Sequence, residues 1–84
     1  MAASDTMTLT VLTPEKTLLE AGVSKVSLPG SKGRFMILKD HAPIISSLEE
    51  GDVIFESDGV TEKVSIMSGF VEVNNNVVTV CAEL

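Results

Sequence analysis

Apolar and polar residues alternate along most of this 84-residue chain, and the alternation limits the folds that it can adopt. Residues 7–11 are the clearest case, since Met, Leu and Val alternate there with threonine. The same pattern returns in residues 25–28, 52–55, 60–67 and 78–81. Successive side chains of a β-strand point to opposite faces, whereas a helix repeats about every 3.6 residues and cannot use a period of two. Valine and threonine are abundant in these segments and suit a pleated, half-buried surface. The pattern predicts a strand in each segment.

Turn residues separate the predicted strands. Three such clusters are Pro29-Gly30, Ser57-Asp58-Gly59 and Asn74-Asn75-Asn76. Residues 14–20 are the only helix-like segment, and they are too few to form a stable helix alone. The length and the 44% hydrophobic content indicate one domain, and we find neither repeats nor linkers. We expect an all-β fold, a small β-sandwich or flattened barrel over residues 7–84, after a disordered or extended segment of residues 1–6.

The net charge of −6 is unevenly distributed along the chain. Residues 1–39 carry five of the six basic groups and three acids, whereas residues 40–84 carry one lysine and nine acids. Nucleic acid binding is disfavoured, because phosphate contacts need a concentrated basic surface. Two interpretations remain open: a solvated acidic surface, or an acidic flank that meets a basic partner while a small basic patch meets another. That patch comprises Lys32, Arg34 and Lys39.

The residue types needed for catalysis or metal binding are scarce. With one histidine and one cysteine, far apart, the chain has no zinc site of the usual ligand spacing and no internal disulfide. Cys81 alternates with apolar neighbours, so we expect a buried, inert thiol rather than a nucleophile. The adjacent Glu49 and Glu50 face opposite ways on a strand and do not converge on a substrate. We expect no catalytic residue, metal or cofactor, and the short apolar runs predict no direct membrane insertion.

A Gly-Ser-Lys-Gly turn at residues 30–33 has two interpretations. It matches the Gly-x-x-Gly of RNA-binding KH loops, which join two helices and lie against phosphates. Its flanking segments, however, are typical of strands, and the chain is acidic. A P-loop is excluded by the spacing. We therefore expect a strand-joining turn in which both glycines supply a positive φ angle, and keep RNA binding as an alternative.

The only histidine, His41, lies in an Asp-His-Ala-Pro turn between two apolar runs. Pro43 fixes its own φ and disfavours the helical region for Ala42, so the turn is expected to be extended. The imidazole either caps backbone groups of its own turn or contacts another protein. Nothing nearby pairs it with a serine or cysteine nucleophile. The turn is a candidate contact point rather than a candidate catalyst.

Residues 33–48 resemble the central signature of the epsilon subunit of F-type ATP synthases, in which a glycine turn, an apolar strand and a His-Ala-Pro turn follow one another. Four further pieces are similar to that family in the same order. They are the opening strand at residues 8–14, the bend from Leu48 to Gly51, and the last two strands at residues 68–73 and 76–80. Together they resemble the family's N-terminal domain over residues 7–82, which implies a β-sandwich of about ten short strands.

The resemblance implies a non-catalytic subunit of the central stalk, the rotor of a proton- or sodium-driven ATP synthase. Such a subunit docks on the gamma subunit and the c-ring and couples ion-driven rotation to ATP synthesis. It lies at the cytoplasmic face of the bacterial inner membrane, peripheral through the complex. The family's positions imply a gamma contact at His41, Ala42, Pro43, Ile44 and Thr13, and a c-ring contact at Ser31, Lys32 and Arg34. Arg34 and Met36 stand where the family often has an acid and a glycine, so the ring contact departs from the usual pattern.

The family usually continues past its last strand into two helices, which in bacterial members can bind ATP and block rotation. This sequence ends at Leu84, directly after the last predicted strand. Its short polar start resembles neither a secretory signal nor a transit peptide, and we expect a naturally short subunit rather than a truncated one. Without those helices we expect no ATP binding. The alternative is a free-standing β-sandwich module that binds another protein or a small ligand.

Overall fold

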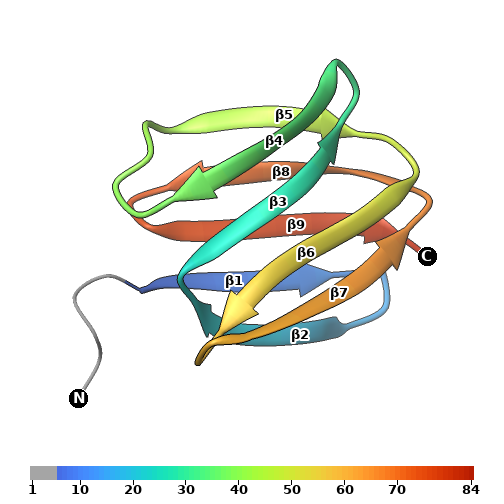
Figure 1. Ribbon diagram of the computed structural model, residues 1–84. Helices are drawn as coiled ribbons and strands as arrows, with labels where there is room; N and C mark the ends of the chain where they lie inside the picture. The colour runs from blue at the N-terminus through green and yellow to red at the C-terminus, as the bar shows by residue number, and fades with distance from the viewer. Residues whose placement is uncertain (1–5) are drawn as a thin grey trace.

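A computed structural model describes residues 6–84 and shows nine β-strands and no helix among them (Figure 1). The strands are β1 (Met7–Leu12), β2 (Thr17–Val23), β3 (Lys25–Gly30), β4 (Gly33–Leu38), β5 (Ile44–Leu48), β6 (Gly51–Ser57), β7 (Val60–Ile66), β8 (Ser68–Asn74) and β9 (Val77–Glu83). The all-β class is confirmed, and each alternating segment forms a strand. A disordered or extended segment was expected at residues 1–6. Residues 1–5 of it lie outside the described part of the chain.

The strands form two layers of one curled sheet (Figure 1). Strands β2, β1, β9, β8 and β5 follow one another in the first layer, and β3, β6 and β7 follow in the second, where β4 pairs with β3. The path passes between the layers through Gly30 and Leu48, the residues that pair β3 with β5. Strands β1 and β9 run parallel, while the other paired strands are antiparallel. The predicted sandwich is therefore a single sheet folded onto itself.

Aliphatic side chains, together with Phe55, fill the space between the layers. Alternate residues of each strand supply them, as the sequence pattern predicts. Met7, Leu9 and Val11 of β1 are buried, and so are Val78 and Val80 of β9. Within residues 6–84 no polar or charged side chain is buried. Protein interiors pack at about the density of organic crystals and deform little, so the sandwich behaves as one stiff body.

The helix-like segment at residues 14–20 forms a turn and the start of β2 instead. The backbone N–H of Thr13 donates to the carbonyl oxygen of Lys16 at 2.9 Å, and the N–H of Lys16 donates to Thr13 Oγ1 at 3.3 Å. This turn brings Leu12 opposite Thr17, and the chain returns along β1. Pairing of residues 17–23 with β1 satisfies their backbone hydrogen bonds, whereas a helix of seven residues would be too short to offset the free-energy cost of helix nucleation.

Candidate functional site

The His41 turn connects β4 to β5 at one end of the sandwich. The backbone N–H of His41 donates to the carbonyl oxygen of Leu38 at 3.2 Å, which closes the turn. The imidazole Nδ1 lies 2.7 Å from the carbonyl oxygen of Ala42. A carbonyl oxygen only accepts, so a hydrogen bond here requires the proton on Nδ1. His41 thus has the geometry expected of a residue that caps its own turn, and it is nevertheless exposed.

Apolar residues follow His41, but they differ in exposure. Ala42 and Pro43 are exposed, whereas Ile44 is partly buried against the core. Its neighbour Ile45 is 75% exposed, the highest value among the large apolar side chains of residues 6–84. Alternation in β5 turns Ile45 outward as it turns Ile44 inward, and sequence reasoning that follows the family's positions passes over this residue. An apolar contact beside His41 would therefore involve Ile45 more than Ile44.

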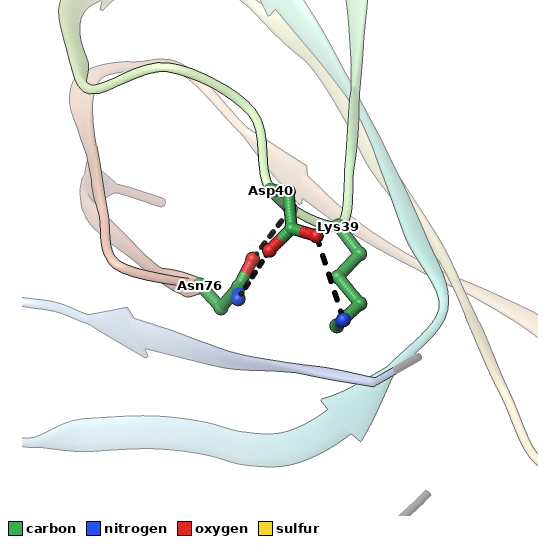
Figure 2. Close-up of polar contacts among 3 residues, drawn as sticks. All are labelled: Lys39, Asp40 and Asn76. Carbon is green, nitrogen blue, oxygen red and sulfur yellow. Dashed lines mark hydrogen bonds and ion pairs between the residues drawn. The ribbon is translucent and has the colours of Figure 1, made fainter. Parts of the chain in front are cut away.

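The residue before His41 is held by a partner from another turn (Figure 2). Asp40 has a φ angle of 66°, in the left-handed region that few non-glycine residues adopt. Its backbone N–H donates to Asn76 Oδ1 at 2.6 Å, and Asn76 Nδ2 donates to Asp40 Oδ1 at 3.0 Å. Lys39 Nζ lies 3.5 Å from the other carboxylate oxygen. The hydrogen bond from Asn76, and then the charge of Lys39, hold the pKa of Asp40 below its ordinary value.

Asn76 is itself tied to the first layer of the sheet. It lies in the turn between β8 and β9 with a φ angle of 63°, beside Asn75 at 54°. Its carbonyl oxygen accepts the backbone N–H of Thr8 at 3.0 Å. Asn and Asp tolerate this backbone region better than other non-glycine residues. Asn76 therefore joins the His41 turn, the β8–β9 turn and the start of β1.

The turn at residues 30–33 lies at the other end of β5. The backbone N–H of Ser31 donates to the carbonyl oxygen of Ser47 at 3.1 Å, and Ser47 Oγ donates to Ser31 Oγ at 2.9 Å. The turn joins two strands rather than two helices, so the geometry of a KH loop is absent. The expectation for its glycines is half wrong: Gly33 has a φ angle of 126°, but Gly30 is extended. Gly30 is needed for space, because a Cβ there would lie 2.6 Å from the carbonyl oxygen of Gly33.

Of the three residues expected at the c-ring, Arg34 does not extend from the turn. Its Nη1 donates to Ser27 Oγ at 2.9 Å and its Nη2 donates to the carbonyl oxygen of Asp52 at 2.7 Å. The guanidinium thus lies across β3 toward β6. Ser31 is also engaged, through Ser47. Lys32 is exposed, and the described part of the chain offers its ammonium no ion pair.

Thr13 is separated from His41 by the length of the sandwich. Parallel pairing places Leu12 beside Cys81, while Thr8, at the opposite end of β1, lies beside Val77 and the Asn76 turn. Five residues of strand span about 17 Å. The expectation that Thr13 shares a face with the His41 turn therefore does not fit the strand order. Its hydroxyl also donates to the carbonyl oxygen of Lys16 at 3.2 Å.

Thr13 borders an open apolar groove of about 400 Å³, whose other lining residues include Leu12, Pro14, Phe70 and Cys81. Cys81 is half-buried here, not buried as expected. Val80 and Ala82 face the core, so Cys81 must point outward between them.

The two layers differ in the charges of their outer faces. Outward positions of the first layer include three carboxylates and no basic residue. These carboxylates are Glu20, Glu72 and Glu83. The second layer carries Lys25 paired with Glu56 at 3.8 Å and Lys63 paired with Asp52 at 3.6 Å. Of the acidic residues of the expected flank, Asp52 and Glu56 are thus paired on the second layer, whereas Glu72 and Glu83 have no ion pair among the described residues and lie on the first.

Within residues 6–84, no three His, Cys, Asp or Glu side chains gather as a metal site would need. The same residues contain no helix long and apolar enough to cross a membrane.

Comparison with known proteins identifies the family. Residues 6–84 match the family described as the ATP synthase delta/epsilon chain β-sandwich domain. The ATP synthase epsilon chain of Desulfitobacterium hafniense is 44% identical over 78 residues, which cover 93% of this chain and 59% of that protein. The epsilon chain of Symbiobacterium thermophilum is 42% identical over 78 residues, 92% of this chain and 56% of that one. The chain belongs to the ATP synthase delta/epsilon family and spans less than two thirds of these relatives.

Solved structures share the fold. A chain of the Euglena gracilis mitochondrial ATP synthase, in a structure of OSCP, F1 and c-ring, has a TM-score of 0.88 at 21% identity. The match covers 98% of this chain and 53% of that one. A chain of the Tetrahymena thermophila mitochondrial ATP synthase, from its central stalk and c-ring, has a TM-score of 0.78 at 19% identity, over 93% and 63% of the two chains.

Proposed function

We propose that this chain is the β-sandwich part of a non-catalytic central-stalk subunit of an ATP synthase. It docks on the gamma subunit and on the c-ring, and it helps to couple proton- or sodium-driven rotation to ATP synthesis. The observation that carries this proposal is the match of residues 6–84 to the delta/epsilon family. In a bacterial cell such a subunit lies at the cytoplasmic face of the inner membrane, held there by its partners.

The arrangement of the two turns supports a bridging role. Strand β5 begins at Ile44, directly after the His41 turn, and ends at Leu48, which pairs with Gly30 beside the other turn. A subunit that passes torque between two partners needs separate contact surfaces on a stiff body. The close-packed apolar core provides that stiffness.

We assign the gamma contact to His41, Ala42 and Pro43, with Ile44 and its exposed neighbour Ile45. The c-ring contact is assigned to the turn at the other end, where Lys32 is exposed and has no ion pair among the described residues. Thr13 lies at that same end, so a gamma contact that includes it would extend along the whole first layer. The acidic outer face of that layer suits a partner with basic residues.

Size-exclusion chromatography with the purified gamma subunit of the same organism tests the proposal. We expect the two proteins to co-elute, and we expect His41→Ala to weaken the complex. Glu62→Ala on the edge strand β7 is the matched control and should leave co-elution unchanged. Separate elution of the unaltered chain and gamma would overturn the proposed function. Intact co-elution of His41→Ala would move the contact away from the turn.

A further inference from the structure

We propose that Asn76 is a positioning residue, whose side chain holds the His41 turn in the shape in which it docks on its partner protein. Asn76 lies 36 residues beyond Asp40 and belongs to a different turn. The inference rests on the proposed function, because it requires the His41 turn to be a docking site.

The contact with Asp40 fixes both its backbone and its side chain. Asn76 Oδ1 accepts the backbone N–H of Asp40, and Asn76 Nδ2 donates to the Asp40 carboxylate. Two hydrogen bonds in opposite directions define the position of Asp40 better than either bond alone. This matters because a non-glycine residue at a φ angle of 66° adopts a disfavoured backbone and keeps it only where its surroundings hold it. Asp40 directly precedes His41, so its φ and ψ set the direction in which the imidazole leaves the turn.

Asn76 is a firm anchor for this contact. Its carbonyl oxygen accepts the N–H of Thr8, and β1 lies between β2 and β9 within the first layer. Lys39 approaches the carboxylate oxygen that Asn76 does not use, so the two neighbours do not compete for Asp40. Figure 2 shows Asn76 reaching Asp40 from one side and Lys39 from the other.

Release of the turn would lower affinity without removing any residue that touches the partner. A protein whose binding-competent shape is only partly populated binds with its dissociation constant divided by that populated fraction. If the turn holds its docking shape about a tenth of the time without Asn76, the dissociation constant rises about tenfold.

Three variants test this. Asn76→Gly removes the side chain at a φ angle that glycine adopts freely, so the hairpin is kept. Asn75→Gly makes the same change at the adjacent left-handed residue, which is not a partner of Asp40. Asp40→Asn removes the charge but keeps the backbone N–H and a side-chain oxygen that accepts from Asn76. Calorimetry with the gamma subunit gives the dissociation constant, and hydrogen exchange of the Asp40 amide reports the turn itself.

We expect Asn76→Gly to raise the dissociation constant about tenfold and to speed exchange of the Asp40 amide, while Asn75→Gly and Asp40→Asn stay near the unaltered chain. Unchanged binding by Asn76→Gly would overturn the inference. Equal weakening by Asp40→Asn would also overturn it, since the charge of Asp40 would then be what the partner contacts. If the unaltered chain does not bind gamma, the proposed function fails, and the amide exchange alone decides whether Asn76 holds the turn.

Discussion

Arg34 and Asp52 are joined across the outer face of the second layer, where Arg34 Nη2 donates to the backbone carbonyl oxygen of Asp52 at 2.7 Å. The other guanidinium nitrogen, Nη1, donates to Ser27 Oγ. Among the described strands, β4 is hydrogen-bonded through its backbone to β3 alone. The Arg34 side chain adds a connection from β4 to β6, the strand on the other side of β3. Arg34 therefore has a structural role inside the domain, apart from any contact with the c-ring.

Arg34→Lys is expected to destabilise the domain although it keeps the charge. A lysine ammonium lacks the planar fork that reaches two acceptors at once. Loss of one of the two hydrogen bonds should cost about 1 kcal/mol in the free energy of unfolding, measured by urea denaturation. Lys32→Arg, in the adjacent turn, is the control and should leave stability unchanged. If Arg34→Lys is as stable as the unaltered chain, the two hydrogen bonds of the guanidinium do not stabilise the domain. Arg34 would then again be a candidate for the c-ring contact.

Ser65→Ala is expected to raise the pKa of Asp52. Ser65 Oγ donates to Asp52 Oδ1 at 2.6 Å, and this bond, followed by the nearby Lys63 and Arg34, holds the pKa of Asp52 below its ordinary value of 3.8. A carboxyl group with a lowered folded pKa stabilises the protein fully above about pH 4 and loses that effect as the pH falls through the lowered value. The stability deficit of Ser65→Ala should therefore shrink below about pH 4.

NMR titration of the Asp52 carboxyl carbon measures this pKa directly. Ser57→Ala is the matched control, because Ser57 Oγ donates to the carbonyl oxygen of Gly22 rather than to a carboxylate. An Asp52 pKa that is the same with and without Ser65 would show that the charges of Lys63 and Arg34 are its main cause.

Gly69→Ala is expected to destabilise the first layer, where β8 and β9 lie very close. A Cβ at Gly69 would overlap the carbonyl oxygen of Cys81 on the neighbouring strand. Because backbone must move to accept it, we expect a loss of about 1–3 kcal/mol, the usual cost of overpacking. At Gly22 the nearest atom to such a Cβ is 4.0 Å away, so Gly22→Ala is a matched control. Thermal unfolding gives the melting temperature of each variant. Equal melting temperatures would mean that the backbone of β9 moves to accept the Cβ at little cost in stability.

The strands could be predicted from the sequence because their signal is local. Alternation is a property of neighbouring residues, and in residues 7–11 it correctly identifies which side chains are buried. It also holds for Cys81, which alternates with Val80 and therefore points outward; the buried thiol was expected only because the neighbours of Cys81 are apolar. Residues 14–20 were interpreted as helix-like but too short for a stable helix, and strand β2 was not predicted, because its pairing with β1 cannot be seen in the short segment alone.

The candidate site depends on contacts between segments that are far apart in the sequence, and these contacts could not be predicted from the sequence. Nothing near Asp40 indicates that Asn76 will reach it, since both residues are typical of any turn. The separation of Thr13 from His41 follows from the parallel pairing of β1 with β9, which joins the two ends of the chain. Strand order and register are set by the whole sheet, so a position near the end of a strand does not reveal which end of the molecule it occupies.

Lys32→Glu is expected to weaken binding to the c-ring, as the proposed ring contact requires. Lys32 is exposed in the turn after Gly30 and is not one of the paired cations of the described chain. Reversal of a charge at an interface costs affinity, and an ionic contact weakens with salt because the Debye length shortens to about 8 Å at physiological ionic strength.

Pull-down with detergent-purified c-ring at low and high salt should show less binding by the variant at low salt and a smaller difference at high salt. Lys25→Glu makes the same change in net charge at the opposite end of β3 from the 30–33 turn and is the control. If both variants lose the same amount of binding, the ring senses the overall charge of the chain, and the contact with the 30–33 turn is wrong.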